Sequence, residues 1–279
     1  MKKVALLFPG QGSQYVGMGQ KLAAESSLVR DIFARADEVL GFSLSRICFE
    51  GPNEELKLTS HTQPALLAHS YALYSYLKEN LGHSFSTEVV LGHSVGEYMA
   101  LVAAEALSFE EALKLVRLRG SLMQEAVPVG VGKMVAILGM DADLLIAGAK
   151  EVSAQGAGHQ VMCANFNSMQ QIVVSGDAMG CDELVLLLKE KHADIRFKSI
   201  ELPVSAPFHC SLMNPAAEKM KDALEKAEIS STKLPYIANV DAKLYPVGTK
   251  KDVLINNLVK QIPSAVLWTQ SIGLLDNDL

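Results

Sequence analysis

The stretch "VVLGHSVGEYMAL", residues 89–101, places a serine between two glycines where an apolar, strand-like run meets a helix-forming one. A turn this sharp requires glycine at Gly92 and Gly96, because side chains at those two positions would clash. The turn would also push the Ser94 hydroxyl out of the fold beside a helix N-terminus, where developing negative charge is stabilised. This is the geometry of a nucleophile elbow. Because this pentapeptide is common by chance, it indicates a catalytic serine only where a strand precedes it and a helix follows it.

Strands and helices alternate along the first half of the chain. Apolar runs, helical spacing and Gly, Pro or Ser punctuation predict the following segments: a buried strand at 4–8, a helical segment at 19–41 ended by Gly41, a helix at 62–82 with Pro64 in its first turn, a strand at 88–91, and a helix from a Ser108 capping box to about Gln124. Alternating elements of these lengths imply a parallel sheet covered by helices on both faces.

The middle of the chain changes character. Its pattern predicts, in order, a strand at 133–139, a helix at 141–156, strands at 161–168 and 171–176, a helix at 177–192 and a strand at 195–202. The order β-α-β-β-α-β is the ferredoxin-like pattern. We therefore predict an α/β protein in which a large domain, residues 1–130 and 202–279, is interrupted by a small subdomain, residues 131–201, with a cleft between them.

Composition argues against several classes of protein. A net charge of −6 offers no basic excess to meet phosphates, so nucleic-acid binding is not expected. No apolar run reaches the length of a membrane span or of a signal-peptide core. The four cysteines, Cys48, Cys163, Cys181 and Cys210, lie far apart without a C-x-x-C pair, which favours free thiols in a reducing compartment over a zinc site. We expect a soluble cytoplasmic protein without a metal.

A serine needs a base to become a useful nucleophile at neutral pH. Among the seven histidines, His209 stands out because it follows a strand-like run and a proline-stiffened turn where the chain returns from the small subdomain. His93 adjoins Ser94, but its side chain should leave a tight elbow in another direction, which favours a packing role. The other histidines lie on expected helix surfaces, helix ends or a Gly-rich loop and are expected to be solvated. For His209 a structural role near the core stays open.

An acyl-transfer site also needs hydrogen-bond donors for the oxyanion. The N–H of Val95, at the start of the helix after the elbow, is one candidate. The loop "PGQGSQ", residues 9–14, follows the first strand, and parallel strands bring their C-terminal ends to one rim. The side-chain amide of Gln11 is therefore a candidate second donor, although polar Gly-rich turns are also common after strands that carry no site.

Arg119 falls on a helix whose apolar spacing marks Leu115, Leu118 and Leu122 as the inward side. A guanidinium beside a buried stripe needs an anion, either a structural Asp or Glu or a substrate carboxylate held by its planar fork. Of these two, the structural ion pair is the more common arrangement.

Six motifs follow one another from one end of the chain to the other: "FPGQGSQ" at 8–14, "TQPA" at 62–65, "GHSVGEY" at 92–98, "RG..MQEA" at 119–126, "APFH" at 206–209, and "ANVDA" at 238–242 with "Q......W" at 261–268. In this order they resemble the malonyl-CoA:acyl carrier protein transacylase family, the acyltransferases of fatty-acid and polyketide synthesis.

The resemblance implies an α/β-hydrolase-like large domain with a parallel sheet, a ferredoxin-like (βαββαβ) small subdomain, and a ping-pong reaction that uses no cofactor. Ser94 would attack the thioester of malonyl-CoA with His209 as general base, and the pantetheine thiol of acyl carrier protein would then take the acyl group. Gln11 and the Val95 amide would hold the oxyanion, and Arg119 would bind the malonyl carboxylate.

The resemblance also implies supporting residues. Gln261 would orient His209 through a backbone carbonyl, which replaces the acid of a usual triad. Phe208 before the histidine and Val95 after the serine fit a malonyl pocket better than a branched methylmalonyl one, and His93 and Asn239 are expected to support the site. We expect a monomer that binds malonyl-CoA and acyl carrier protein, and neither nucleic acid nor a membrane.

The chain departs from the family pattern in two places. Ala265-Val266, with Leu267 following, stands where the family has Pro-Val before the tryptophan, which leaves the packing near Gln261 open. The family also usually continues past "SIGLL" with a further strand, a Gly-Pro-Gly turn and a closing helix. A naturally short chain and a truncated one are both open, and a missing strand would expose a sheet edge.

Three other interpretations stay open. A trans-acting acyltransferase of a polyketide synthase would use the same chemistry. A non-catalytic carrier-protein-binding module would keep the fold for docking alone, and a lipase-like hydrolase would need an acidic triad partner and no buried arginine.

Docking of a carrier protein would need a local positive patch, because acyl carrier proteins and this chain are both acidic. The candidate patch is Lys189, Lys191, Arg196 and Lys198, around the last helix and strand of the small subdomain. A solvated run of surface charges is the alternative.

Overall fold

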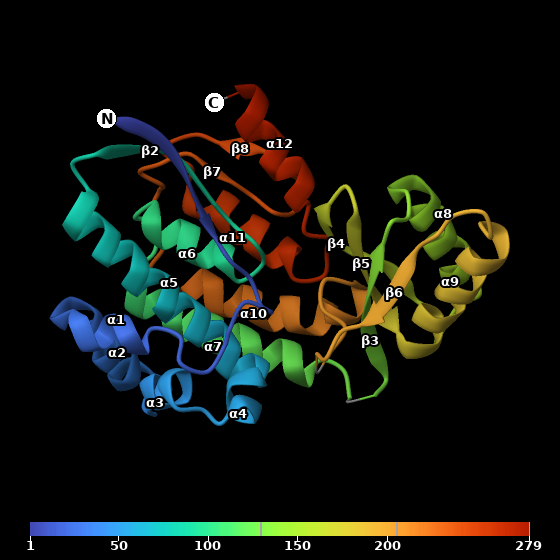
Figure 1. Ribbon diagram of the computed structural model, residues 1–279, viewed down its shortest axis with the longest axis horizontal. Coiled ribbons are helices and arrows are strands. Elements are labelled where there is room, and N and C mark those ends of the chain that lie inside the picture. The colour runs from blue at the N-terminus through green and yellow to red at the C-terminus, as the bar shows by residue number, and fades with distance from the viewer. Residues whose placement is uncertain (129, 205, 279) are drawn as a thin grey trace.

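Two β-sheets organise the chain in the computed structural model, which describes residues 1–128, 130–204 and 206–278 (Figure 1). The first sheet has the order β1-β2-β7-β8, with β1 at Lys2–Phe8, β2 at Phe85–Gly92, β7 at Tyr236–Ile237 and β8 at Leu244–Tyr245. Strands β1, β2 and β7 run parallel, as the alternation predicts. β8 returns antiparallel beside β7 after a short turn, so the sheet is mixed and not parallel throughout.

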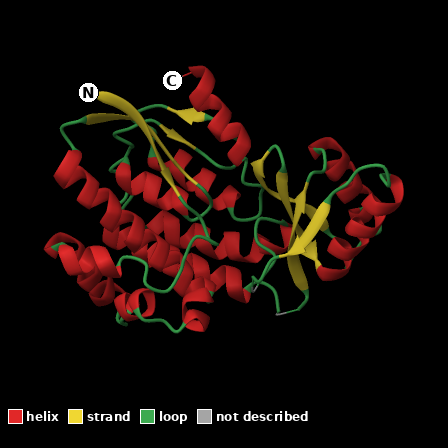
Figure 2. Ribbon diagram, in the orientation of Figure 1, coloured by secondary structure: helices red, strands yellow, loops and turns green. Residues whose placement is uncertain are grey.

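Helices cover both faces of the first sheet (Figure 2). Side chains alternate along β2, so Val90 enters the main core while Val89 and Leu91 face the opposite way, toward the helix α12, Trp268–Asp278. The helices of the main core are α1 Gln20–Glu25, α2 Ser27–Leu40, α3 Leu44–Phe49, α4 Asn53–Lys57, α5 Thr59–Leu81, α6 Gly96–Ala103, α7 Phe109–Glu125, α10 Asn214–Lys226 and α11 Lys251–Gln261, with a short 3-10 turn η1 at Ser211–Met213.

The helical segment predicted over 19–41 is two helices. The chain leaves the helical conformation at Ser26, whose side chain accepts a hydrogen bond from the Val29 amide and so caps α2. Helical spacing alone does not reveal this break, because Ser26 closes one helix and starts the next without a glycine or proline. The predicted stop at Gly41 is present, in the left-handed conformation that favours glycine.

Helix α5 starts at Thr59, three residues before the predicted start, and therefore holds Pro64 inside it and not in its first turn. Proline has no N–H, so the carbonyl of Ser60 loses its helical partner. A guanidinium nitrogen of Arg117 on α7 donates to that carbonyl at 2.5 Å. The neighbouring helix thus compensates for the proline.

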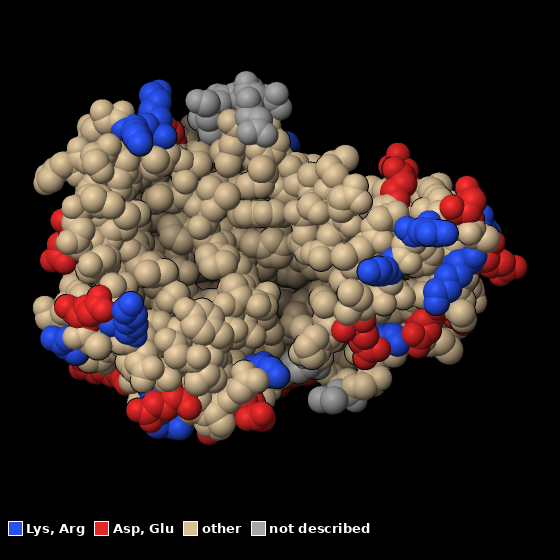
Figure 3. All heavy atoms as spheres, viewed as in Figure 1, with Lys and Arg blue, Asp and Glu red and all other residues tan. Residues whose placement is uncertain are grey.

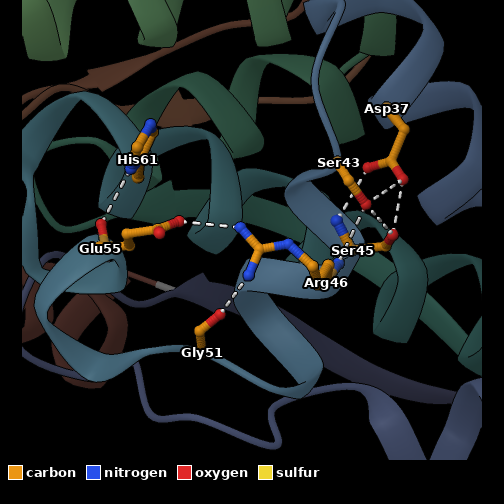
Figure 4. A network of polar contacts seen from close by, with 7 residues as sticks. All are labelled: Asp37, Ser43, Ser45, Arg46, Gly51, Glu55 and His61. Atoms are coloured by element: carbon orange, nitrogen blue, oxygen red, sulfur yellow. Dashed lines mark hydrogen bonds and ion pairs between the residues drawn. The ribbon is translucent and has the colours of Figure 1, made fainter.

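A polar network stabilises the segment between α2 and α5 (Figure 4). The Asp37 carboxylate accepts hydrogen bonds from the backbone and side chain of Ser45 at the start of α3. Arg46 donates to the Gly51 carbonyl and to the Glu55 carboxylate, each at 3.0 Å. These contacts join α3 to α2 and to α4, and the Glu55 carbonyl of α4 forms a hydrogen bond with His61 of α5 at 2.9 Å.

The second sheet has the order β4-β5-β3-β6 and is antiparallel throughout. The β-α-β-β-α-β order predicted for 133–202 is present, with β6 shorter than predicted, and its elements are β3 Gly132–Leu138, α8 Ala142–Ser153, β4 Val161–Ser168, β5 Gln171–Asp177, α9 Ala178–Lys191 and β6 Lys198–Glu201. Val135 and Ile137 of β3 pack on the side of α8 and α9, whereas Met134 and Ala136 face the main core. One face of this sheet therefore forms a wall toward the first sheet.

The two parts of the molecule meet along a hollowed face. In Figure 3 the centre of this face is hollowed, and Lys, Arg, Asp and Glu lie mainly at its margins. The segment after α11 joins the two sheets, because Val266 bonds to the edge of β4 through the Ala164 carbonyl and the Phe166 amide. Within the described ranges, none of the helices has the length and apolarity needed to cross a membrane.

Candidate active site

The predicted strand–turn–helix around Ser94 is present. β2 ends at Gly92, α6 begins at Gly96, and Ser94 between them has a φ of 53°. A Cβ on Gly92 would lie 2.0 Å from the Gly96 carbonyl carbon, and a Cβ on Gly96 would lie 2.4 Å from the Phe8 carbonyl oxygen of β1. Both glycines are therefore required by close backbone approach, and the turn lies at the C-terminal ends of β1 and β2.

Ser94 and His209 come together across 115 residues of sequence. The Ser94 hydroxyl donates to Nε2 of His209 at 2.7 Å, and the other ring nitrogen, Nδ1, donates to the backbone carbonyl of Gln261 at 2.9 Å. A carbonyl can only accept, so Nδ1 carries the proton and Nε2 is left as the acceptor. Burial, together with the charge of Arg119, lowers the pKa of His209 to about 3. The imidazole is therefore neutral and ready to take a proton at neutral pH.

Arg119 lies on the buried face of α7 and not beside it. The predicted inward side included Leu118, which is exposed, whereas Arg119 is fully buried together with Val116 and Met123. Its Nη2 donates to the Ser94 hydroxyl at 3.2 Å and its Nη1 donates to a neighbouring amide oxygen, that of Gln63, at 2.9 Å.

No ion pair to Arg119 exists among the residues that the structure describes, and its Nε has no hydrogen-bond partner there. Burial lowers the pKa of Arg119, but a guanidinium starts so high that it keeps its charge. The structural ion pair that the sequence favours is thus absent from the described contacts, and the cation lies beside the serine with unused donor capacity.

A buried polar network stands behind the serine. The side chain of Gln261 donates to the Ser94 carbonyl at 3.0 Å and to Glu97 at 2.7 Å, and its oxygen accepts from Arg119 Nη2 at 2.8 Å. Asn239 accepts from the Ser94 amide at 2.6 Å and donates to the Gly92 carbonyl at 2.7 Å, so it ties the two sides of the elbow together.

A cavity of about 120 Å³ opens onto these groups. Its lining residues are Gln11, Gln63, His93, Ser94, Arg119, Met123, Met134, Asn165, Asn167, Val173, Leu202, Val204, Phe208 and His209. The second sheet supplies Met134, Asn165, Asn167 and Val173, and the main-core side supplies the serine, the histidines and the arginine. The cavity therefore lies in the predicted cleft between the two parts of the chain.

The remaining predicted site residues lie around this cavity. His93 forms a hydrogen bond to Asn167 at 2.9 Å and packs against the ring of Trp268, so it does leave the elbow in another direction. Val95 starts the turn into α6, and in the described part of the chain its amide donates no hydrogen bond. The Gln11 side-chain amide makes a long contact of 3.4 Å to the Thr59 hydroxyl.

Sequence reasoning missed three residues of this site. Gln63 binds Arg119, Asn167 binds His93, and Glu97 binds Gln261. Gln63 and Glu97 lie inside the quoted motifs, so the signal for them was a polar side chain at a position where the apolar pattern predicts burial. Asn167 lies in β4 and carries no such signal.

The arrangement can carry out acyl chemistry. A neutral imidazole can remove the serine proton, an unused amide at the start of α6 can stabilise an oxyanion, and the guanidinium can hold an anionic part of the acyl group. Among the described residues, no cluster of three or more His, Cys, Asp or Glu side chains is placed to hold a metal ion.

Comparison with known proteins shows to which family the chain belongs. The acyl transferase domain matches residues 5–267, so the chain belongs to the acyl transferase family. Within that family its similarity is to the malonyl CoA-acyl carrier protein transacylases, which confirms the resemblance seen in the motifs.

Three relatives show the extent of this similarity. The malonyl CoA-acyl carrier protein transacylase of Bacillus subtilis is 45% identical over 99% of this chain and 83% of that protein. FabD of Acinetobacter baumannii superposes with a TM-score of 0.91 and 43% identity, over 99% of this chain and 84% of that one. A malonyl-transacylase solved in complex with a type II polyketide acyl-carrier protein gives a TM-score of 0.91 and 38% identity, over 99% of this chain and 85% of that one.

Proposed function

We propose that this chain transfers the malonyl group from malonyl-CoA to the pantetheine thiol of acyl carrier protein, supplying fatty-acid synthesis. The observation that carries the proposal is Arg119: a fully buried cation, 3.2 Å from the Ser94 hydroxyl, with no ion-pair partner among the described residues. A buried charge without a direct ion-pair partner is costly, and a malonyl carboxylate on Ser94 would provide one. The names of the relatives support the same substrate pair.

In the first half-reaction His209 Nε2 takes the Ser94 proton while Ser94 Oγ attacks the thioester carbonyl. The tetrahedral adduct collapses, the C–S bond breaks, and His209 returns the proton to the departing CoA sulfur. The product is a malonyl ester on Ser94. The backbone carbonyl of Gln261 keeps the His209 tautomer fixed throughout, and an uncharged acceptor suffices there because the imidazolium is transient.

In the second half-reaction the pantetheine thiol of acyl carrier protein gives its proton to His209 Nε2 and attacks the ester. Collapse of this adduct breaks the bond to Ser94 Oγ, which recovers the proton. The same groups thus serve both directions, as a ping-pong mechanism requires.

Two donors are proposed for the oxyanion, the Val95 amide and Gln11. The Val95 amide is at the start of α6, where unpaired N–H groups and the helix dipole favour negative charge. The side-chain amide of Gln11 lines the cavity, and its 3.4 Å contact with Thr59 is long enough to be exchanged for a stronger one to an oxyanion.

Substrate choice is assigned to Arg119 and Phe208. The guanidinium fork matches a carboxylate in a way that an uncharged acetyl group cannot use. Phe208 lines the cavity beside His209 and restricts the space available to a branched acyl group. His93 and Asn239 are assigned supporting roles, because each fixes the backbone or a side chain next to Ser94.

We infer an α/β-hydrolase-like large domain, residues 1–130 and 202–279, and a ferredoxin-like small subdomain, residues 131–201. The parallel strands β1, β2 and β7 support the first assignment, and the antiparallel order β4-β5-β3-β6 with two helices on one face supports the second. A monomer, a cytoplasmic location, and the lack of a cofactor, nucleic-acid or membrane partner stay predictions of the sequence.

One observation supports polyketide synthesis as the alternative pathway. One of the structures similar to this chain was solved in complex with a polyketide acyl-carrier protein, so a polyketide carrier is the alternative acceptor. The Ser94–His209 hydrogen bond argues against a non-catalytic docking module, because a chain kept for docking alone has no need of a paired nucleophile and base.

Steady-state kinetics with both substrates test the proposed function. When malonyl-CoA and acyl carrier protein are varied together, a ping-pong enzyme gives parallel lines in double-reciprocal plots. Intersecting lines, or hydrolysis of malonyl-CoA without transfer, would contradict the proposal. Comparison of fatty-acid and polyketide carriers as acceptors separates the two pathways.

A further inference from the structure

Glu97 is a fully buried acidic side chain, and the mechanism above gives it no step. It is the second residue of α6, immediately after the elbow that holds Ser94. Among residues whose side chains the structure describes, it is the one acidic group in the buried set. Burying a carboxyl group is costly unless its partners make use of it, so its contacts indicate what it does.

One oxygen of Glu97 makes all of its hydrogen bonds in the described structure. Oε2 accepts from the Gln261 side chain at 2.7 Å and from the Asn239 amide at 3.1 Å, while Oε1 is buried with no partner there. An amide side chain has one oxygen and one NH₂ group. Because the NH₂ of Gln261 donates to Glu97, its oxygen is left to face Arg119 at 2.8 Å.

The chain Glu97–Gln261–Arg119 links the acid to the cation without direct contact. Glu97 therefore offsets the charge of the buried guanidinium across one intervening amide. It leaves Arg119 with unused donors, among them Nε, which has no hydrogen-bond partner in the described structure. A direct ion pair would occupy those donors, whereas this arrangement keeps them for an incoming anion.

We propose that Glu97 is a positioning residue that sets how strongly Arg119 holds the malonyl carboxylate: ionised Glu97 opposes a second anion at Arg119, and protonation of Glu97 removes that opposition. The inference rests on the proposed malonyl transfer and adds to it a proton-linked control of substrate choice.

The charged and titratable groups that interact with Glu97 are Arg119 on α7, Asp241 after β7, and the tyrosines Tyr98 on α6, Tyr236 on β7 and Tyr245 on β8. Burial raises the pKa of Glu97 to about 7, although its hydrogen bonds and Arg119 act to lower it. The tyrosine pKa values are raised and that of His209 is far below neutrality, so Glu97 is the group in this network that titrates near pH 7.

The direction of the effect follows from the sign of the charge. Below the pKa of Glu97 the acid is neutral, and Arg119 faces the malonyl carboxylate without competition. As the pH rises through that pKa, Glu97 gains a negative charge and the affinity for malonyl falls. An acetyl group is neutral and should not respond. By linkage, malonylation of Ser94 must raise the proton affinity of Glu97 by the same factor.

The test compares kcat/KM of CoA release for malonyl-CoA and acetyl-CoA from about pH 5.5 to about pH 8.5, the range in which a group with a pKa near 7 changes charge. Acetyl-CoA carries the same nucleotide, so the ratio of the two values cancels its titration. For the wild-type enzyme we expect the malonyl-to-acetyl ratio to fall about tenfold across this range. A ratio that does not change with pH would overturn the inference.

Glu97→Gln keeps the size of the side chain and an oxygen that can accept from Gln261 and Asn239, but removes the charge. We expect its malonyl-to-acetyl ratio to stay at the low-pH value throughout. The control Glu125→Gln removes an exposed carboxylate from α7 and should keep the wild-type profile. If Glu97 had only a structural role, the pH dependence of the ratio would persist in Glu97→Gln. Persistence would therefore also contradict the proposal.

Proton uptake provides a readout that does not depend on the variant folding. With a pH indicator in weak buffer near pH 7, malonylation of wild-type enzyme should take up more protons than acetylation does. Equal uptake for the two acyl groups would overturn the inference. If the wild-type enzyme releases no CoA from malonyl-CoA at any pH, the proposed function itself fails, which is a distinguishable result.

Discussion

Ser94 and His209 both occupy the left-handed region of backbone conformation, with φ of 53° and 59°. Residues with a side chain rarely adopt it, and such strain persists where the surroundings over-determine it, most often at functional sites. Here Asn239 and Gln261 hold the backbone of Ser94, and the carbonyl of Gln261 holds the ring of His209. The geometry of the pair is thus set by long-range hydrogen bonds as well as by the local turn.

His209→Ala should slow acylation by a factor on the order of 100 to 10,000, the usual effect of a positioned general base. Because the pKa of His209 is lowered to about 3, the base stays neutral in the wild-type enzyme from pH 5 upward. Acetyl transfer to Ser94 should therefore show no loss of rate between about pH 7 and about pH 5. Single-turnover CoA release measures both effects, and a loss below tenfold would return His209 to a structural role.

Arg119→Ala should invert the preference between malonyl-CoA and acetyl-CoA. Loss of one partner of a buried charged pair costs roughly 2–5 kcal/mol, so malonyl transfer should fall sharply while acetyl transfer stays unchanged or improves. Arg119→Lys should keep only part of the malonyl activity, because a point charge cannot reproduce the bidentate contact. The measurement is kcat/KM for both thioesters.

Lys114→Ala, an exposed cation on the same helix, is the matched control and should change neither value. A parallel fall for both substrates in Arg119→Ala would show that Arg119 supports the structure and not the substrate.

The individual site residues differ in how far sequence could predict them. Ser94 and Val95 follow from a local turn, so their places could be predicted from the pentapeptide and its flanks. The partners of Gln261 could not be predicted, since its side chain joins Ser94, Glu97 and Arg119 from 142 to 167 residues away. Contacts at such separation depend on how the elements pack, which a local pattern does not encode.

At the scale of elements, the turn between β2 and α6 depends on backbone contact with β1. Gly96→Ala would place a methyl group 2.4 Å from the Phe8 carbonyl, and neither backbone can yield without moving the elbow. We expect loss of malonyl-enzyme formation and a lower melting temperature, because overpacking lowers the free energy of unfolding by about 1–3 kcal/mol. Intact-mass and thermal-denaturation measurements check this, and wild-type labelling with an unchanged melting temperature would contradict it.

Element types were more predictable than element boundaries. The strand-helix alternation and the β-α-β-β-α-β order follow from periodicity, and both are present. The break at Ser26 was missed because one capping serine is a weak local signal inside a continuous helical pattern. The early start of α5 was missed because the compensation of Pro64 by Arg117 is a tertiary contact. β8 was missed as an antiparallel strand because a two-residue strand leaves almost no periodic signal.

In the molecule as a whole, one of the four cations of the predicted carrier-docking patch is already paired with an acid. Lys191 is paired with Glu151 at 2.6 Å, so its charge is already offset. Lys189, Arg196 and Lys198 line a hollow of about 670 Å³ that also reaches Gln170 at the β4–β5 turn. Gln170 lies three residues after Asn167, which lines the site cavity.

Reversing Lys189 and Arg196 to Glu should weaken the transfer to acyl carrier protein while sparing acylation by malonyl-CoA, because an acidic carrier would meet repulsion at the hollow. Lys21→Glu on α1, at the opposite end of the molecule in Figure 1, is the control. The two half-reactions are measured separately by CoA release and by carrier acylation. Equal loss in both, or in neither, would assign these charges to a solvated surface.

The role of Ser94 as nucleophile is tested by following the acyl group itself. The protein is incubated with labelled malonyl-CoA, digested and mapped by mass spectrometry, and a second sample is chased with acyl carrier protein before mapping. We expect a malonyl ester on the Ser94 peptide that disappears in the chase as the label moves to the carrier thiol, and no ester in Ser94→Ala. A label on any other residue, or one that persists in Ser94→Ala, would contradict the assignment of Ser94 as the nucleophile.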